Sequence, residues 1–323
     1  AFAAWSAWSA KMVRGDGDTV EQLDGLYVGT GVAEQLLVSF DLGPDPVELL
    51  WPQQGLDDVQ RQLSSVRGTF AVHPQIDYSF GLMPADDLRA LRPLAEVVFL
   101  PPVPDAEKFL CVGKNYHEHA KEFAGSGFDG GAKDVVPPSP VVFSKPHTAI
   151  IAIGEPILSH LDPTGGLDYE GELALVIGTG GRGITKAAAL SHVFGYTIIN
   201  DVTARHLQKR HSQWVLGKGL DSFCPMGPAI LTADEAPDPT KLRLMTHVNG
   251  EKRQDALVAD LIFDVPTLIE AISAAITLEP GDVIATGTPV GVGIGFTPPK
   301  FLQKGDMVRI EISGIGVLEN PVA

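Results

Sequence analysis

Short runs of apolar and β-branched residues recur from about residue 108 to the end of the chain. Glycine, proline and polar residues bound these runs, which is typical of strands. Strands are predicted at 108–113, 141–143, 173–177, 196–199, 242–248, 282–285 and 308–312. Helices are predicted at 116–123, 203–210 and, with the clearest amphipathic pattern, 265–277. Many short strands with few helices predict an α+β, mainly β fold, arranged as a sandwich or a roll.

The Pro-rich segment 100–105 predicts a domain boundary. Residues 1–10 form a short biased repeat, which we interpret as a leader or an added tail. Residues 11–104 are predicted to form a small N-terminal domain. They include a polar helical candidate at 56–66 but no clustered histidines, acids or basic residues. The candidate chemistry therefore lies in a second domain, residues 105–323.

Composition narrows the class of protein. Of 323 residues, 35 are glycine and 25 are proline, which favours a turn-rich β architecture over a helical bundle. The net charge of −16 argues against nucleic acid and anionic membrane partners. The chain has no apolar run near the roughly 20 residues that span a bilayer. Cys111 and Cys224 have no CxxC partner, so we expect free thiols in a cytoplasmic protein.

Three acidic residues lie at the ends of two predicted strands. Glu170 and Glu172 stand at the beginning of one predicted strand, and side chains two residues apart in a strand point to the same face. Asp201 ends the next apolar run and can join them. Three converging carboxylates repel one another unless a cation lies between them, and an all-oxygen ligand set suits Mg²⁺ or Mn²⁺. The sequence therefore predicts a metal site.

A helix should follow Asp201 and place Arg205 and Gln208 on the face that carries the acid. Arginine binds a carboxylate through two parallel hydrogen bonds. A second helix carries His119 and Glu122, three residues apart, where a carboxylate can orient a histidine that acts as a general base. The open alternative is that both helix faces are simply solvated.

Other polar residues stand in apolar or glycine-rich surroundings. Lys218 lies between glycines, where it either extends to solvent or stabilises a developing negative charge. Thr288 opens a glycine-rich loop whose N–H groups could hold a carboxylate. The stretch 178–183 fits the GxGxxG pattern of dinucleotide-binding proteins, but no alternation of strands and helices continues after it.

Several motifs together resemble the fumarylacetoacetate hydrolase superfamily over about residues 108–320. They are listed here as they stand in the chain: CVGKNYHEHA at 111–120, FSKP at 143–146, the Glu170-x-Glu172 pair, NDVTAR at 200–205 and TGTP at 286–289. Within that superfamily the chain looks most like a bacterial subgroup with oxaloacetate decarboxylase-like and diketo-acid hydrolase members.

The resemblance implies a mixed β-sandwich roll with a small N-terminal α/β domain, usually in a homodimer. It implies that Glu170, Glu172 and Asp201 hold Mg²⁺ or Mn²⁺, and that His119 and Glu122 activate water. It also implies that Lys218 stabilises the reacting oxygen and that Arg205, Gln208, Thr288 and Lys145 bind the substrate. Fumarylacetoacetate hydrolase itself carries a further acidic ligand shortly before its histidine, and residues 109–116 contain no acid.

Three activities remain open on this basis. The leading hypothesis is hydrolysis of a C–C bond in a 2,4-dioxo acid, which yields pyruvate and a second acid. The same electron sink would serve an oxaloacetate decarboxylase or a 2-oxo acid isomerase or tautomerase. A non-catalytic metabolite-binding protein is a further alternative. In each case the expected partner is a small anionic 2-oxo acid.

Overall fold

The computed structural model describes residues 10–15, 20–29, 36–40, 98–129, 134–211 and 213–323. The chain divides into two compact units, residues 1–100 and 101–323. In the first unit, β1 (Ala10–Gly15), β2 (Val20–Gly29) and β3 (Leu36–Phe40) form an antiparallel sheet. Residues 1–9 of the predicted leader and the helix predicted at 56–66 lie outside the described residues.

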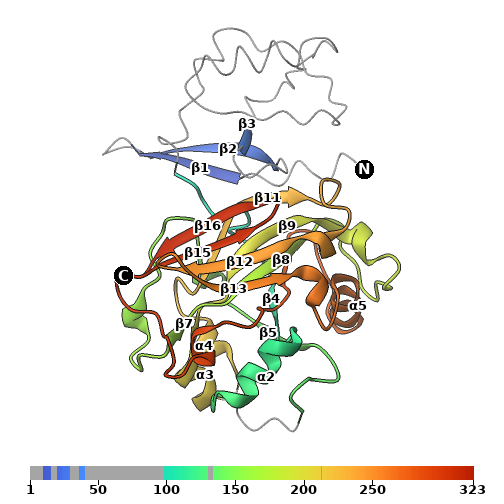
Figure 1. Cartoon of the computed structure of the whole chain (residues 1–323). Coiled ribbons are helices and arrows are strands. Elements are labelled where there is room, and N and C mark those ends of the chain that lie inside the picture. The colour runs from blue at the N-terminus through green and yellow to red at the C-terminus, as the bar shows by residue number, and fades with distance from the viewer. Residues whose placement is uncertain (1–9, 16–19, 30–35, 41–97, 130–133, 212) are drawn as a thin grey trace. The chain divides into compact units, whose positions relative to one another are not determined.

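The second unit is built on a mixed seven-stranded sheet with the order β5-β4-β14-β8-β9-β11-β6 (Figure 1). Its strands are β4 (Phe109–Gly113), β5 (Val141–Ser144), β6 (Ile150–Ile151), β8 (Gly171–Ile177), β9 (Val193–Asn200), β11 (Cys224–Thr232) and β14 (Val283–Ala285). The pairs β4–β14 and β6–β11 are parallel, and the other neighbours are antiparallel. Each strand predicted by apolar patterning within this sheet is confirmed.

A four-stranded antiparallel sheet with the order β13-β12-β15-β16 packs against the larger one (Figure 1). Its strands are β12 (Arg243–Val248), β13 (Glu251–Leu257), β15 (Met307–Ile312) and β16 (Gly316–Pro321). The short strands β7 (Leu167–Asp168) and β10 (Thr203–Ala204) pair separately. The arrangement confirms the mainly β prediction.

Within the described residues of the second unit, the α-helices are α2 (His117–Gly125), α3 (Arg205–His211), α4 (Val215–Lys218) and α5 (Val265–Ala275). Figure 1 shows α2, α3 and α4 gathered at one end of the sheets. Short 3₁₀ turns occupy His147–Ala149, Ser159–Leu161, Ala189–His192, Pro239–Lys241, Val258–Asp260 and Gly293–Gly295. Among the described residues, no helix is long and apolar enough to cross a membrane.

One helix begins later than predicted. The pattern predicted helix from residue 203, but Thr203 and Ala204 pair with Asp168 and Leu167 and are extended. The helix therefore begins at Arg205, and Asp201 lies in the short link between β9 and β10 rather than on the helical face.

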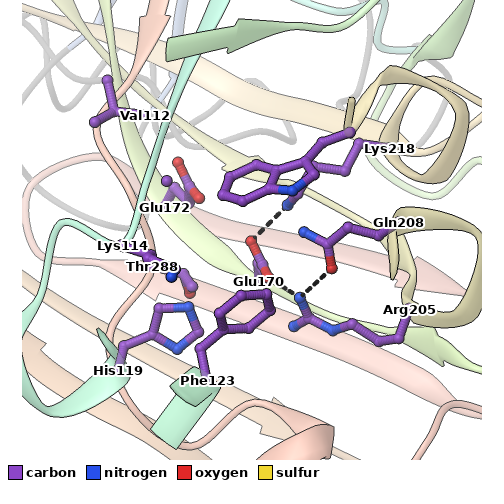
Figure 2. Close-up of a pocket in the computed structure, with 12 residues that line it drawn as sticks. Val112, Lys114, His119, Phe123, Glu170, Glu172, Arg205, Gln208, Lys218 and Thr288 are labelled. Atoms are coloured by element: carbon purple, nitrogen blue, oxygen red, sulfur yellow. Dashed lines mark hydrogen bonds and ion pairs between the residues drawn. The ribbon is translucent and has the colours of Figure 1, made fainter. Parts of the chain in front are cut away.

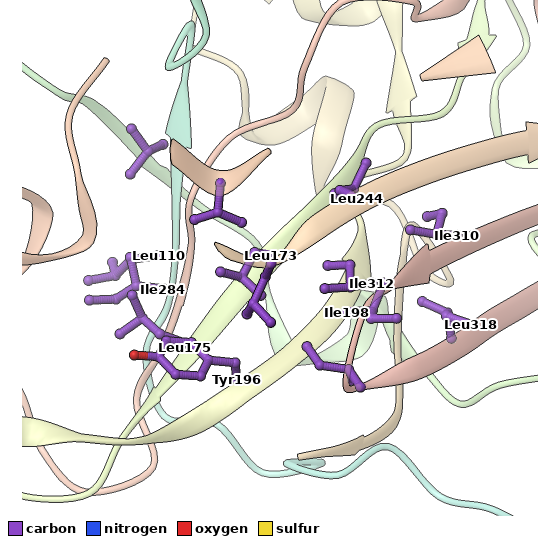
Figure 3. Close-up of a cluster of buried hydrophobic side chains, with 14 of the residues drawn as sticks. Leu110, Leu173, Leu175, Tyr196, Ile198, Leu244, Ile284, Ile310, Ile312 and Leu318 are labelled. Carbon is purple, nitrogen blue, oxygen red and sulfur yellow. The ribbon is translucent and has the colours of Figure 1, made fainter. Parts of the chain in front are cut away.

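The core explains why the acids lie where they do. Along β8, Leu173 and Leu175 face the main hydrophobic cluster, which also receives Leu244, Ile310 and Ile312 from the smaller sheet (Figure 3). Ala174 and Val176 point the other way, into a second cluster. Because side chains alternate along a strand, Glu172 and Glu170 continue this second row. The apolar row thus becomes acidic at the end of the sheet near α2, α3 and α4.

The GxGxxG-like stretch is a turn whose amides are already occupied. The N–H groups of Gly178 and Thr179 donate to the carbonyl of His192, and that of Gly181 donates to Leu278. A phosphate cradle needs such N–H groups to be free. The dinucleotide-binding alternative is therefore wrong.

Candidate active site

The two glutamates and the aspartate meet where β8 and β9 adjoin. The antiparallel register places Gly171 opposite Asn200, so Glu170 and Asp201 lie next to the end of this pair. Ligand oxygens of Glu170, Glu172 and Asp201 lie within 4.8 Å of one another, and all three residues are buried. The predicted convergence on one face is confirmed.

Three buried cations contact the acids directly: Lys218, Arg205 and Lys145. The Lys218 ammonium lies 2.8 Å from Glu170 Oε2 and 2.5 Å from Asp201 Oδ2, and it donates to Thr203 Oγ1 at 2.9 Å. Arg205 Nη1 lies 2.6 Å from Glu170 Oε1. Burial lowers the pKa of Lys218, but the carboxylates of Asp201 and Glu170 outweigh burial and raise it above its usual value. Lys218 is therefore charged at neutral pH.

Lys145 is fully enclosed by protein acceptors. Its ammonium lies 2.7 Å from Asp201 Oδ1 and donates to the carbonyls of Val202, Phe223 and Lys218. Its side chain has no exposed surface, and it does not line the pocket described below. In this structure Lys145 contacts Asp201 rather than the space that a substrate would enter.

The electrostatics of the three acids suit a divalent cation. Burial raises the pKa of Glu172, and Asp201 and Glu170 raise it further, so the pKa lies well above its usual value. Burial also raises the pKa of Glu170, but Lys218 and Arg205 reverse the effect and hold it below its usual value. A cation bound next to Glu172 would therefore stabilise the ionised form of its side chain. Carboxylate oxygens are the donors that Mg²⁺ and Mn²⁺ prefer, so the residues fit such an ion.

His119 and Glu122 form the predicted pair on α2. His119 Nδ1 lies 3.0 Å from Glu122 Oε2, and His119 is 4% exposed. With its proton on Nδ1 facing the carboxylate, the ring has a free lone pair on Nε2. His117 and Glu118 fit this role by residue type, but both are exposed. The solvated-face alternative is therefore wrong for His119.

A glycine-rich loop, residues 287–295, connects these groups through backbone N–H donors. Gly287 N–H donates to Glu172 Oε2 at 2.8 Å, and Gly291 N–H donates to Glu122 Oε1 at 3.0 Å. Gly293 N–H donates to Asp168 Oδ1 at 2.6 Å. The sequence predicted that N–H groups of this loop could hold a carboxylate, and in the structure they hold three carboxylates of the protein itself.

Asp168 was not predicted as a functional residue. Its side chain is fully buried and accepts the N–H groups of Gly293 and Ile294. It also accepts Arg205 Nε at 2.9 Å, so it anchors the guanidinium from the side opposite Glu170. Burial raises the pKa of Asp168, although Arg205 opposes the shift. Its position two residues before Glu170 is the sequence signal that could have identified it.

A small pocket, partly open to solvent, lies over these residues (Figure 2). Its walls include seven of the predicted residues: His119, Glu170, Glu172, Arg205, Gln208, Lys218 and Thr288. Gln208 accepts from Arg205 Nη1 at 3.3 Å. The Thr288 hydroxyl donates to the carbonyl of Gly171 and accepts from Gln254, so its hydrogen is already used.

The pocket wall also includes residues that the sequence did not indicate. Trp214 packs edge-on against Phe123, at 6.2 Å between ring centroids, and against Phe143 at 5.3 Å. Lys114 lines the pocket beyond the acid cluster. A tryptophan within a polar, helix-compatible stretch is a signal that could have identified Trp214.

Comparison with known proteins agrees with this geometry. Residues 108–323 match the model of the fumarylacetoacetate hydrolase C-terminal family, and the chain belongs to this family. The chain is 46% identical over 255 residues to the oxaloacetate tautomerase YisK of Bacillus subtilis, covering 78% of this chain and 82% of that protein.

Solved structures of related enzymes also match this chain. A 2-hydroxyhepta-2,4-diene-1,7-dioate isomerase from Mycobacterium marinum matches with a TM-score of 0.66 at 34% identity, covering 98% of each chain. A fumarylpyruvate hydrolase from Pseudomonas aeruginosa, in complex with Mn²⁺ and pyruvate, matches with a TM-score of 0.59 at 33% identity. That match covers 68% of this chain and 90% of the hydrolase. The relatives are thus enzymes with tautomerase, isomerase and hydrolase activities.

Proposed function

We propose that this protein is a divalent-metal-dependent enzyme that interconverts the keto and enol forms of a 2-oxo acid. The observation that carries the proposal is the buried acid triad, whose Glu170 also contacts Arg205 and Lys218. The similarity to an oxaloacetate tautomerase supports enolisation as the reaction. The same site contains the groups that any of the related reactions would need.

Glu170, Glu172 and Asp201 would hold Mg²⁺ or Mn²⁺. The bound ion would supply Lewis-acid polarisation of the 2-oxo group. Arg205 and Gln208 would bind the 1-carboxylate, since Arg205 carries a buried Nη2 that makes no hydrogen bond within the described residues. Thr288 would contribute to the same wall of the pocket.

His119 would act as the base. Its Nε2 would accept the proton from C3 of the substrate, and the electron pair of the C–H bond would become the C2=C3 double bond. Glu122 would hold the ring and stabilise its protonated form. Lys218, charged and buried, would balance the negative charge that develops on the 2-oxygen. The π electrons of the 2-oxo group would move onto its oxygen, and the proton held by His119 Nε2 would then pass to that oxygen, which gives the enol and restores the neutral histidine.

Hydrolysis of a 2,4-dioxo acid is a second candidate function. The His119–Glu122 pair, 3.0 Å apart beside the pocket, is also suited to deprotonating water for attack on a distal carbonyl. The similarity to a fumarylpyruvate hydrolase supports this alternative. The products would be pyruvate and a second acid.

The test compares two substrates in the presence of Mg²⁺ or Mn²⁺, with EDTA as the control. Decay of enol-oxaloacetate is followed by ultraviolet absorbance, and pyruvate release is followed with acetylpyruvate and with oxaloacetate. Tautomerisation without pyruvate release supports the proposal. Pyruvate from acetylpyruvate indicates the hydrolase, and pyruvate from oxaloacetate indicates a decarboxylase. Turnover of neither substrate contradicts all three.

A matched pair of variants assigns the base. His119→Gln should lower the rate of enolisation by about 10²-fold or more. His117→Gln alters an exposed histidine on the same helix and should leave the rate unchanged. Equal effects of the two substitutions would contradict the role of His119.

The homodimer also remains a prediction, and light scattering in solution would test it.

A further inference from the structure

Lys114 is a pocket-lining cation that the proposed chemistry does not use. It follows β4 directly, is 6% exposed and has a φ of 57°, in the left-handed region that residues other than glycine seldom adopt. The next residue, Asn115, anchors this turn, because its side chain donates to the carbonyls of Phe263 and Thr286. The backbone therefore holds Lys114 in a defined place, as at many binding sites.

Lys114 differs from the other cations of the pocket in its partner. Arg205 and Lys218 contact Glu170, within the acid cluster. Lys114 Nζ lies 3.0 Å from Asp129 Oδ2 instead, and Asp129 does not belong to that cluster. The Lys114 ammonium also lies 5.0 Å from the centre of the Phe123 ring, another wall of the pocket. An ammonium has three N–H donors, so Asp129 does not exhaust its capacity.

Lys114 also differs from Arg205 in its position in the pocket. Figure 2 shows Lys114 and Arg205 on opposite sides of the pocket, with Glu170 between them. A ligand whose 1-carboxylate lies at Arg205 would thus extend toward Lys114. The buried acids Asp168, Glu170, Glu172 and Asp201 face three buried cations, Lys145, Arg205 and Lys218. With a divalent ion this group would have a net charge of about +1, which one carboxylate neutralises. A second carboxylate would need a further cation.

We propose that Lys114 binds the distal carboxylate of the substrate, so that the pocket selects 2-oxo dicarboxylic acids over 2-oxo monocarboxylic acids. The inference rests on the proposed function and specifies the substrate class of the same site. The incoming carboxylate shares the Lys114 ammonium with Asp129 or replaces Asp129 as its partner. The low exposure of Lys114 strengthens this charge-assisted hydrogen bond, because little water competes for the ammonium.

The test measures kcat/KM for enolisation of oxaloacetate, a dicarboxylate, beside acetylpyruvate, a monocarboxylate. Lys114→Met keeps the length of the side chain and removes its charge. It should lower kcat/KM for oxaloacetate by roughly 10- to 100-fold more than for acetylpyruvate. Lys114→Arg should retain most of the preference for oxaloacetate. Asp129→Asn releases the lysine from its partner and should keep or lower the KM for oxaloacetate.

Equal losses on both substrates in Lys114→Met, or no loss on oxaloacetate, would overturn the inference and leave the proposed function intact. If the parent protein enolises neither substrate, the proposed function fails. Binding then decides the role of Lys114, with malate compared with lactate by calorimetry on the Mg²⁺-loaded protein. A preference for malate that disappears in Lys114→Met supports the inference, and an unchanged preference overturns it.

Discussion

Gly295 has no room for a side chain, because Glu122 fills the space beside it. A Cβ atom at Gly295 would lie 1.8 Å from Glu122 Oε1 and 2.5 Å from Glu122 Cδ. Protein Cβ atoms essentially never approach other atoms within 3.0 Å. In Gly295→Ala, Glu122 or the loop must therefore move by about 1.2 Å. Glu122 cannot make this movement and also keep its bonds to His119 and to Gly291 N–H as they are.

The expected consequence is a loss of rate with metal binding preserved. A displacement of about 1 Å in a catalytic group can cost about 10²-fold in rate, and we expect a fall in kcat of this size. Overpacking should also destabilise the fold by about 1–3 kcal/mol. The acid triad lies outside the disturbed contact, so the rise in Tm caused by Mg²⁺ or Mn²⁺ should persist. The assay is steady-state enolisation of oxaloacetate, together with thermal unfolding with and without the ion.

Gly125→Ala is the matched control. Gly125 ends the same helix as His119 and Glu122, and a Cβ there would meet no atom within 4 Å. This variant should match the parent in kcat. Glu122→Gln provides a second comparison and should show a similar loss to Gly295→Ala. A folded Gly295→Ala protein whose kcat lies within twofold of the parent would refute the reasoning.

Further predictions concern the acids of the site. Glu170→Gln should abolish the rise in Tm that Mg²⁺ or Mn²⁺ causes, and a rise of the parental size would contradict its assignment as a ligand. Because the folded pKa of Glu172 is raised, the metal-free protein should lose stability as the pH rises above about 4.5, through that pKa. Thermal unfolding across this range should show the loss, and a saturating divalent ion should reduce it. Asp168→Asn weakens the anchoring of Arg205 and should raise the KM by about 10-fold or more while divalent affinity changes little, so an unchanged KM would count against the anchor.

Local pattern predicted much of the fold. Apolar runs bounded by glycine located β4, β8 and β9, and amphipathic spacing located α5. The strand at 251–257 was missed because it lies at the edge of its sheet and is largely polar. Its burial pattern contains one fully buried residue, Gln254, so hydrophobic periodicity gives no signal there.

Within the candidate site, the sequence predicted residues whose chemistry follows from local spacing. Glu170 and Glu172 share a face because they are two residues apart, and this holds in any strand. The contact of Lys145 with Asp201 could not be foreseen, because it depends on how β5 and β9 are placed in the curved sheet. Similarly, the pairing of Asp168 with Arg205 links residues 37 apart in the chain.

The backbone donors of the glycine-rich loop have a consequence for how this enzyme family can change. The bonds to Glu172, Glu122 and Asp168 come from the backbone N–H groups of Gly287, Gly291 and Gly293. A Cβ atom at these positions would lie 2.8, 2.0 and 2.5 Å from a neighbouring atom, so the three donor positions require glycine. Val290, within the same loop, is 41% exposed. Its side chain can be replaced without touching the donors. Sequence change in this loop is therefore confined to exposed positions such as Val290, while the glycines that orient the three carboxylates must be kept.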